Sequence, residues 1–129
     1  MISEVLTIKT KRKRAVVDIT DEVQKVVQKV ADACMCHIFV THTTAALTTA
    51  DLDPGGTDLD YLDALEKIVP HLDYRHPHDP SHMPDHILSS LIGTSLTLPV
   101  KNGKLLLGTW QRVVLFEFDG PRDRHVIIY

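Results

Sequence analysis

The sequence predicts a single α+β domain, in which about three helices accompany an antiparallel or mixed β-sheet. Its 129 residues, 43% of them apolar, suffice for one hydrophobic core and not for two. Segments that alternate apolar and polar residues, as strands do, are interspersed with segments whose apolar residues recur every three or four positions, as in helices. We therefore assign residues 1–129 to one domain.

Three strands and a helix are predicted before residue 42. Residues 2–9 place apolar side chains at alternate positions, which is typical of a half-buried or edge strand, and residues 15–19 form a second strand. Thr20 precedes two acids and is expected to cap a helix. The apolar positions of that helix are Val23, Val26, Val27, Val30 and Ala31. Residues 37–41 are predicted to be an interior strand that carries His42 to its end.

The middle of the chain predicts a second helix and a long loop. Turn residues at 51–56 precede Thr57, which can cap a helix that Pro70 ends. The inward positions of this helix are Leu59, Leu62, Leu65 and Val69. Residues 71–83 carry four of the eight histidines, several prolines and little apolar periodicity. We predict a long ordered loop there, lying over a site.

The last third of the chain predicts a short helix followed by strands. Pro84 suits a first helical turn, and Gly93 is placed to end the helix with a positive φ. Asn102-Gly103 is typical of a tight hairpin. We expect strands at residues 96–100, 105–107, 112–118 and 124–129, with the last two joined as an antiparallel meander by the turn at 119–121.

Composition excludes several classes of protein. The net charge of −3 gives no overall field to gather nucleic acid or an anionic membrane, and the basic run at residues 9–14 is interpreted as a strand end or turn. No signal peptide or bilayer-spanning stretch is recognisable, so we expect a soluble, cytoplasmic protein. Cys34 and Cys36 are expected to be packed thiols. The chain lacks a phosphate-binding glycine loop, a nucleophile elbow and a Cys-x-x-Cys motif.

Histidine is the most conspicuous chemical group. Five of the eight histidines fall within sixteen positions, from His71 to His86. His42 at a strand end, His76 in the loop and His86 at a helix start could form an open three-ligand metal site with water in the remaining position. The alternative is surface histidines without a role. Pro84 weakens a helical zinc pair of His82 and His86.

A carboxylate-rich turn and helix start could hold Mg²⁺ through one or two oxygens together with substrate phosphates. Its members are Asp51, Asp53, Asp58 and Asp60. The same carboxylates could instead cap and solvate the helix, which is the simpler interpretation of Asp58.

Two further groups could contact a ligand. Trp110 and Gln111 lie between two strands and could stack on and hydrogen-bond a heteroaromatic ring, or Trp110 could be a core residue beside a bulge. Glu117 lies in an apolar segment, so an inward orientation would require a partner such as Arg122, Arg124 or a substrate cation. Strand alternation could instead place Glu117 in water.

Several segments together resemble the YjbQ-like family, in order and over nearly the whole chain. They are His42-Thr43-Thr44-Ala45-Ala46-Leu47, Asp53-Pro54, Tyr74-Arg75-His76, Met83-Pro84-Asp85-His86, Gly93 to Leu96, Leu107 to Gln111, Glu117 and Gly120-Pro121-Arg122. The resemblance implies a compact α+β sandwich, a homotrimer and a weak thiamine-phosphate synthase activity that some members have. One departure is Ala50-Asp51, where members usually have Asn-Glu, and this puts any ligand role there in doubt.

The resemblance also implies roles for individual residues. His42, His76 and His86 match the family's histidines and would bind a divalent metal, Mg²⁺ or Zn²⁺. Trp110, Gln111 and Glu117 match its Trp-Gln pair and its acid.

The implied reaction joins a pyrimidine diphosphate to a thiazole phosphate. In this transferase hypothesis Trp110 and Gln111 position a ring, Asp53 and Asp60 help to hold metal, and Arg122 meets phosphate. The alternatives are a trimer that binds a metal or an anionic metabolite without turnover, and a hydrolase with water on three histidines. The expected partners are a small phosphorylated metabolite and further copies of the chain, and the site could lie within one subunit or between subunits.

Overall fold

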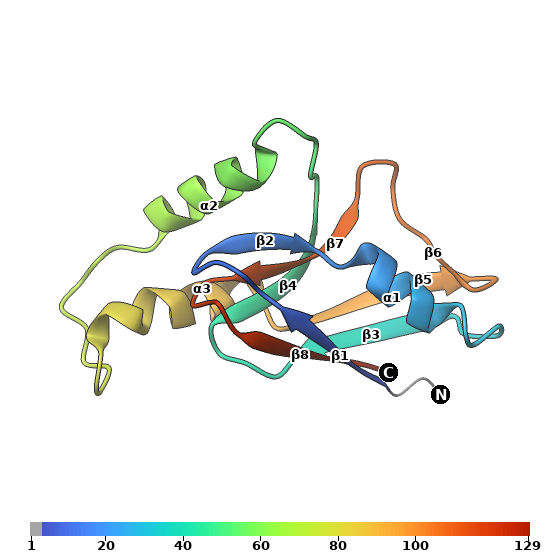
Figure 1. Cartoon of the computed structure of the whole chain (residues 1–129), viewed down its shortest axis with the longest axis horizontal. Coiled ribbons are helices and arrows are strands. Elements are labelled where there is room, and N and C mark those ends of the chain that lie inside the picture. Colours follow the sequence, from blue (N-terminus) through green and yellow to red (C-terminus); the bar gives the residue numbers. More distant parts are fainter. Residues whose placement is uncertain (1–3) are drawn as a thin grey trace.

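The computed structural model describes residues 4–129, which form two antiparallel sheets and three α-helices (Figure 1). The strands of the first sheet lie in the order β1-β8-β3-β5-β6, and those of the second in the order β2-β7-β4. The strands are β1 (Glu4–Lys9), β2 (Ala15–Asp18), β3 (Met35–Val40), β4 (Ala45–Ala50), β5 (Ser95–Lys101), β6 (Lys104–Leu105), β7 (Arg112–Glu117) and β8 (Asp123–Ile128). The helices are α1 (Thr20–Val27), α2 (Thr57–Ile68) and α3 (Met83–Ile92), with a 3₁₀ turn at Pro80–His82. The predicted α+β class is confirmed.

The main hydrophobic core lies between the two sheets. Ile38 and Val126 of the five-stranded sheet belong to the same buried cluster as Leu47 and Leu115 of the three-stranded sheet. The opposite face of the three-stranded sheet packs against α2 and α3 in a second cluster. Strand β7 is therefore covered on both faces, which accounts for its nearly unbroken apolar sequence.

Local signals located most elements correctly. Strand β3 ends at Val40, one residue earlier than predicted and two residues before His42. The hairpin at Asn102-Gly103 is confirmed, with φ of 52° and 74° as a primed turn requires. Pro84 lies in the first turn of α3, and Gly93 follows its last residue with φ of 110°. The position predicted at Ile2 lies outside the described residues.

The predicted helix caps were wrong in two places. Thr20 is the first residue of α1, and its backbone N–H and hydroxyl both donate to the carboxylate of Asp18, at 3.0 and 2.6 Å. The cap of α2 is Gly56 with φ of 104°, and Thr57 makes no side-chain capping bond. Helix α1 also ends at Val27, before two of the apolar positions assigned to it.

The predicted meander of the last two strands was also wrong. Strand β7 pairs with β2 and β4, whereas β8 pairs with β1 and β3. The turn at residues 119–121 therefore carries the chain from one sheet to the other. Alternation and turn residues define the strands and their faces, but they do not identify the neighbour of a strand, which here is far away in the chain.

The outer face of the five-stranded sheet is uncovered by any other element of the described chain (Figure 1). Val5, Ile127 and Phe39 are paired across β1, β8 and β3, so their side chains lie on one face. Phe39 is 37% exposed and the neighbouring Tyr129 is 48% exposed. The face thus presents apolar and aromatic groups to solvent.

Both cysteines are free thiols, as expected, although only one is packed. Cys36 is buried between the sheets, and burial raises the pKa of its thiol to about 11. Cys34 is exposed. Within residues 4–129 no helix has the length and apolarity required to cross a bilayer.

Candidate functional site

Histidines and arginines meet in a cleft of about 400 Å³, which we call the His-Arg cleft. The segment after β3, the start of α3 and the turn between β7 and β8 enclose it. Its lining residues are Thr41, His42, Thr43, Thr44, His82, His86, Asp119, Arg122 and Arg124. The topology explains this convergence, because β3 and β8 are neighbours in one sheet and α3 packs on β4 of the other.

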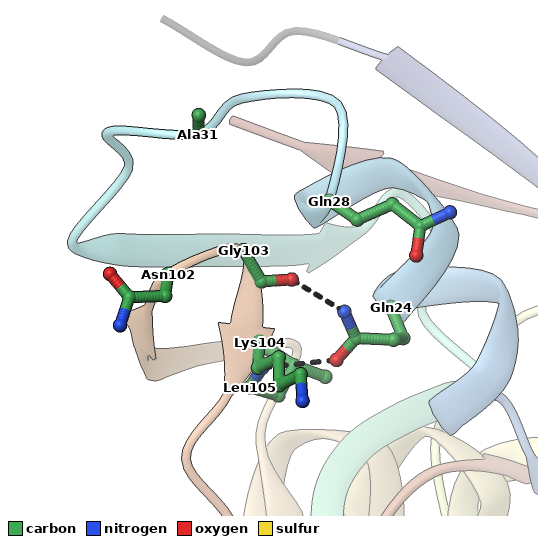
Figure 2. Close-up of a pocket in the computed structure, with 7 residues that line it drawn as sticks. All are labelled: Gln24, Gln28, Ala31, Asn102, Gly103, Lys104 and Leu105. Carbon is green, nitrogen blue, oxygen red and sulfur yellow. Dashed lines mark hydrogen bonds between the residues drawn. The ribbon is translucent and has the colours of Figure 1, made fainter.

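A larger hollow of about 730 Å³ lies between α1 and the β5–β6 hairpin (Figure 2). The side-chain amide of Gln24 bridges this hairpin by donating to the Gly103 carbonyl at 2.7 Å and accepting from the Leu105 N–H at 3.0 Å. Lys104 is the charged residue of its lining. Because its most prominent polar group is already used in holding the hairpin, we place the functional site in the His-Arg cleft.

His42 is a neutral imidazole that accepts a backbone hydrogen bond with one nitrogen and can donate to a ligand with the other. Its Nε2 accepts the backbone N–H of His125 at 2.9 Å, and the two rings stack with centroids 5.6 Å apart. Burial, and next the charge of Arg124, lower the pKa of His42. A neutral imidazole that accepts at Nε2 carries its proton on Nδ1, so His42 offers an N–H to a ligand.

A second group of histidines lies at the start of α3 and in the loop before it, and consists of His76, His82 and His86. His86 donates from Nδ1 to the carbonyl of Thr43 at 3.1 Å, which leaves its Nε2 as the free nitrogen. His76 stacks on His86 with centroids 4.8 Å apart and an interplanar angle of 11°. His82 lies 3.2 Å from a carboxylate oxygen of Asp79. His76 therefore contacts a histidine of the cleft but is not itself part of the lining.

The three histidines predicted as metal ligands are not arranged as a ligand set here. His42 uses Nε2 to accept a backbone N–H, and the parallel stack of His76 on His86 does not direct their nitrogens toward one point. In the part of the chain from residue 4 to 129, no three His, Cys, Asp or Glu side chains are placed to hold a metal ion. The residues present do not fit a divalent metal in this arrangement, and metal binding stays a prediction.

A buried ion pair forms the floor of the cleft. Glu117 is 0% exposed and Arg124 is 1% exposed. The Nε of Arg124 donates to both carboxylate oxygens of Glu117 at 2.9 and 3.1 Å, and its Nη2 donates to Glu117 and to the hydroxyl of Thr44. The hydroxyl of Thr10 and the N–H of Asp119 complete the shell of Glu117. Glu117 therefore faces inward with Arg124 as its partner, one of the options that the sequence left open.

Arg122 is the exposed arginine of the cleft. Its Nε donates to the backbone carbonyl of Asp119 at 2.8 Å and its Nη2 to the carboxylate of the same residue at 3.0 Å. Lys13 lies 3.7 Å from that carboxylate. The one carboxylate in the lining of the cleft is thus paired with cations on both sides.

Four predicted site residues lie away from the His-Arg cleft. Trp110 is 66% exposed, in the loop between β6 and β7, where the side chain of Gln111 accepts the N–H of Gly108 at 2.8 Å. Asp53 lines a separate hollow with Asp18 and Asp58, and Asp60 is exposed on α2. Any contribution of these four residues to the site stays a prediction.

The structure adds residues that sequence reasoning did not assign to the site. Thr44 and Asp119 hold the two arginines, and His82 lines the cleft. Arg124 was considered only as a partner for Glu117. Thr44 could have been identified from the sequence, because it belongs to a run of polar residues at 41–44 that follows a buried strand, and strand ends commonly carry functional groups.

Comparisons with known proteins give one consistent result. The family model described as UPF0047 protein YjbQ-like matches residues 4–129. A UPF0047 protein of Archaeoglobus fulgidus is 40% identical over 124 residues, which are 95% of this chain and 96% of that protein. A crystal structure of a YjbQ/UPF0047 family protein from Clostridium acetobutylicum is 42% identical, with a TM-score of 0.86 and 98% of each chain covered. A hypothetical protein of Aeropyrum pernix has a TM-score of 0.90 at 31% identity, covering 100% of this chain and 97% of its own.

Proposed function

Since the chain belongs to the YjbQ-like UPF0047 family, we propose from the chemistry of the His-Arg cleft that this member binds the phosphate or diphosphate group of a small metabolite. The single observation that carries the proposal is the convergence of two arginines and three histidines on a cleft with one carboxylate in its lining. Guanidinium groups and imidazole N–H groups are the donors that phosphate oxygens prefer in proteins.

The charge balance of the cleft supports an anionic ligand. Asp119 is paired with Arg122, and Glu117 is paired with Arg124, so the arginine charges alone are largely compensated. Asp119 also lies 3.7 Å from Lys13, so this one carboxylate is shared by two cations. The excess positive charge favours an anionic ligand.

The reaction we propose is the transfer suggested by the family resemblance. The carbon–oxygen bond of a pyrimidine-methyl diphosphate breaks, and diphosphate leaves with the electron pair. The ring nitrogen of a thiazole phosphate forms the new carbon–nitrogen bond to the methylene carbon, so no proton has to be removed. Arg122 and the imidazole N–H groups would stabilise the negative charge of the departing diphosphate.

Anion binding can be tested with inorganic diphosphate and isothermal titration calorimetry. Replacing Arg122 or His42 by alanine should weaken binding about 10- to 100-fold, as expected for the loss of a hydrogen bond to a charged group. Arg112→Ala is the matched control, because Arg112 pairs with Asp18 outside the lining of the cleft. Equal affinity of the wild type and both cleft variants would refute the proposed site.

The transferase step has its own test. Purified protein is incubated with the pyrimidine diphosphate and the thiazole phosphate, and thiamine phosphate is measured by its fluorescence after oxidation. Product should form faster than without protein, and more slowly with Arg122→Ala. A wild type that binds diphosphate but forms no product above the background rate would leave a metabolite-binding protein, which is the second candidate function.

We also propose that the uncovered sheet face is covered by further copies of the chain in a homotrimer. Apolar side chains of three strands meet on this face, and an exposed apolar patch of this kind often marks a contact between proteins. Light scattering after size-exclusion chromatography should give three times the mass of the chain for the wild type. Phe39→Asp should lower that mass, whereas Leu72→Asp, at an exposed apolar position elsewhere, should not. A monomeric wild type would rule the trimer out.

A further inference from the structure

The Glu117–Arg124 ion pair is unusual because it is almost completely removed from water. Burying two charges carries a desolvation cost that their attraction only partly offsets, and apolar residues of similar volume often give equal or greater stability. Here the pair is embedded between the sheets and the cleft, with Thr10, Thr44 and the Asp119 N–H around it. Stability alone is therefore a weak reason for a chain to keep such a pair at this position.

The hydrogen bonds of the pair leave one group unused. Both oxygens of Glu117 are bonded, and Nε and Nη2 of Arg124 are bonded. Over residues 4–129, Nη1 of Arg124 has no hydrogen-bond partner. No buried side-chain nitrogen in these residues lacks a partner, so Nη1 is not a buried atom. Since Arg124 lines the His-Arg cleft, Nη1 is the part of the guanidinium that the cleft exposes.

We propose that Arg124 binds the anionic ligand directly through Nη1, and that Glu117 is a positioning residue that fixes the guanidinium from below. The inference rests on the proposed function and deepens it, since it identifies a binding residue and its support. Five donated hydrogen bonds from Nε and Nη2 hold the guanidinium in one orientation. A phosphate oxygen in the cleft then meets a donor that needs no reorganisation.

Arg122 and Arg124 therefore differ in exposure and in the number of groups that hold their side chains. Arg122 is exposed and tied to Asp119 only, so it can move with a ligand, whereas Arg124 is fixed in the floor. A fixed floor donor and a movable rim donor together suit a phosphorylated ligand, because two terminal oxygens can then be bound at once. Arg124 also acts on His42, whose pKa it helps to lower, and so keeps that ring a neutral donor.

The test compares three variants that separate binding from folding. Arg124→Lys keeps a positive charge but loses the planar fork, and the double variant E117L/R124M replaces the pair by apolar groups of similar volume. Arg112→Lys, in the ion pair with Asp18 outside the cleft lining, is the matched control. Circular dichroism confirms the fold of each variant before calorimetry with inorganic diphosphate.

Diphosphate affinity should fall at least about tenfold in R124K and further in E117L/R124M, as the loss of a charged hydrogen bond implies, and should be unchanged in R112K. Since circular dichroism verifies the fold of each variant, a merely structural pair would leave the diphosphate affinity of E117L/R124M unchanged. Should the double variant not fold, R124K alone decides.

The possible outcomes separate a failure of the proposed function from a failure of the role proposed for Arg124. If the wild type does not bind diphosphate at all, the proposed function fails. If binding depends on Arg122 and His42 but is the same in R124K and the wild type, the function stands and the role of Arg124 is refuted.

Discussion

Replacing Glu117 by leucine alone is expected to lower the free energy of unfolding by about 3–5 kcal/mol, because it leaves the guanidinium of Arg124 buried and unpaired. Arg124 would keep only Thr44 as a hydrogen-bond partner. The cost arises from the isolated charge and not from lost packing, since leucine is close to glutamate in volume. Urea denaturation followed by circular dichroism measures the effect.

The double variant E117L/R124M supplies the decisive comparison. Removing the second charge as well should restore most of the lost stability, because no uncompensated ion remains in the interior. A protein that regains stability without regaining diphosphate binding would show that the pair is kept for the site. If E117L alone were as stable as the wild type, or the double variant no more stable than the single one, our account of the buried charges would be wrong.

Gly120→Ala is expected to destabilise the protein by about 3 kcal/mol or more, because the new methyl group has no space. A Cβ built at this position overlaps the carbonyl oxygen of Arg12 and lies 2.9 Å from the Cγ and Oε1 of Glu117. Gly120 also donates its N–H to the carbonyl of Lys13 at 2.9 Å. The turn between β7 and β8 therefore packs closely against the loop between β1 and β2, beside the floor of the cleft.

Gly108→Ala is the matched control for this substitution. A Cβ there would lie 3.1 Å from Oε1 of Gln111, the end of a flexible side chain on an exposed loop. Thermal unfolding should therefore show a change below about 1 kcal/mol for Gly108→Ala, as is usual for surface substitutions, and a large decrease for Gly120→Ala. Similar melting temperatures for the two variants would contradict the close packing at Gly120.

The sequence predicts those parts of the fold that depend on neighbouring residues. Asn102-Gly103 requires positive φ values that any sheet would accept, and Pro84 and Gly93 bound α3 for reasons contained in its own backbone. The partition of β7 and β8 into different sheets has no such local cause. It depends on which distant strand lies beside each of them, and neither strand identifies that neighbour by its own sequence.

The same distinction applies to the site. The chemistry of His42, His86 and Arg122 could be recognised from residue type and position at element ends, and the structure brings these three together. That Trp110 and Gln111 lie outside the cleft lining follows from the path of the loop after β6, which the sequence does not encode locally. The sequence alone could not identify Arg124 as a site residue, because its proposed role depends on Glu117 and on the shape of the cleft floor.

The central claim, that the His-Arg cleft is where a phosphorylated ligand binds, is tested most directly by following the histidine side chains with NMR while inorganic diphosphate is added. We expect saturable shifts of the His42, His82 and His86 resonances with one common dissociation constant, and no shift for His37, which lies on the outer sheet face against Tyr129. Resonances of the cleft histidines that stay unchanged, or that move no more than that of His37, would contradict the claim.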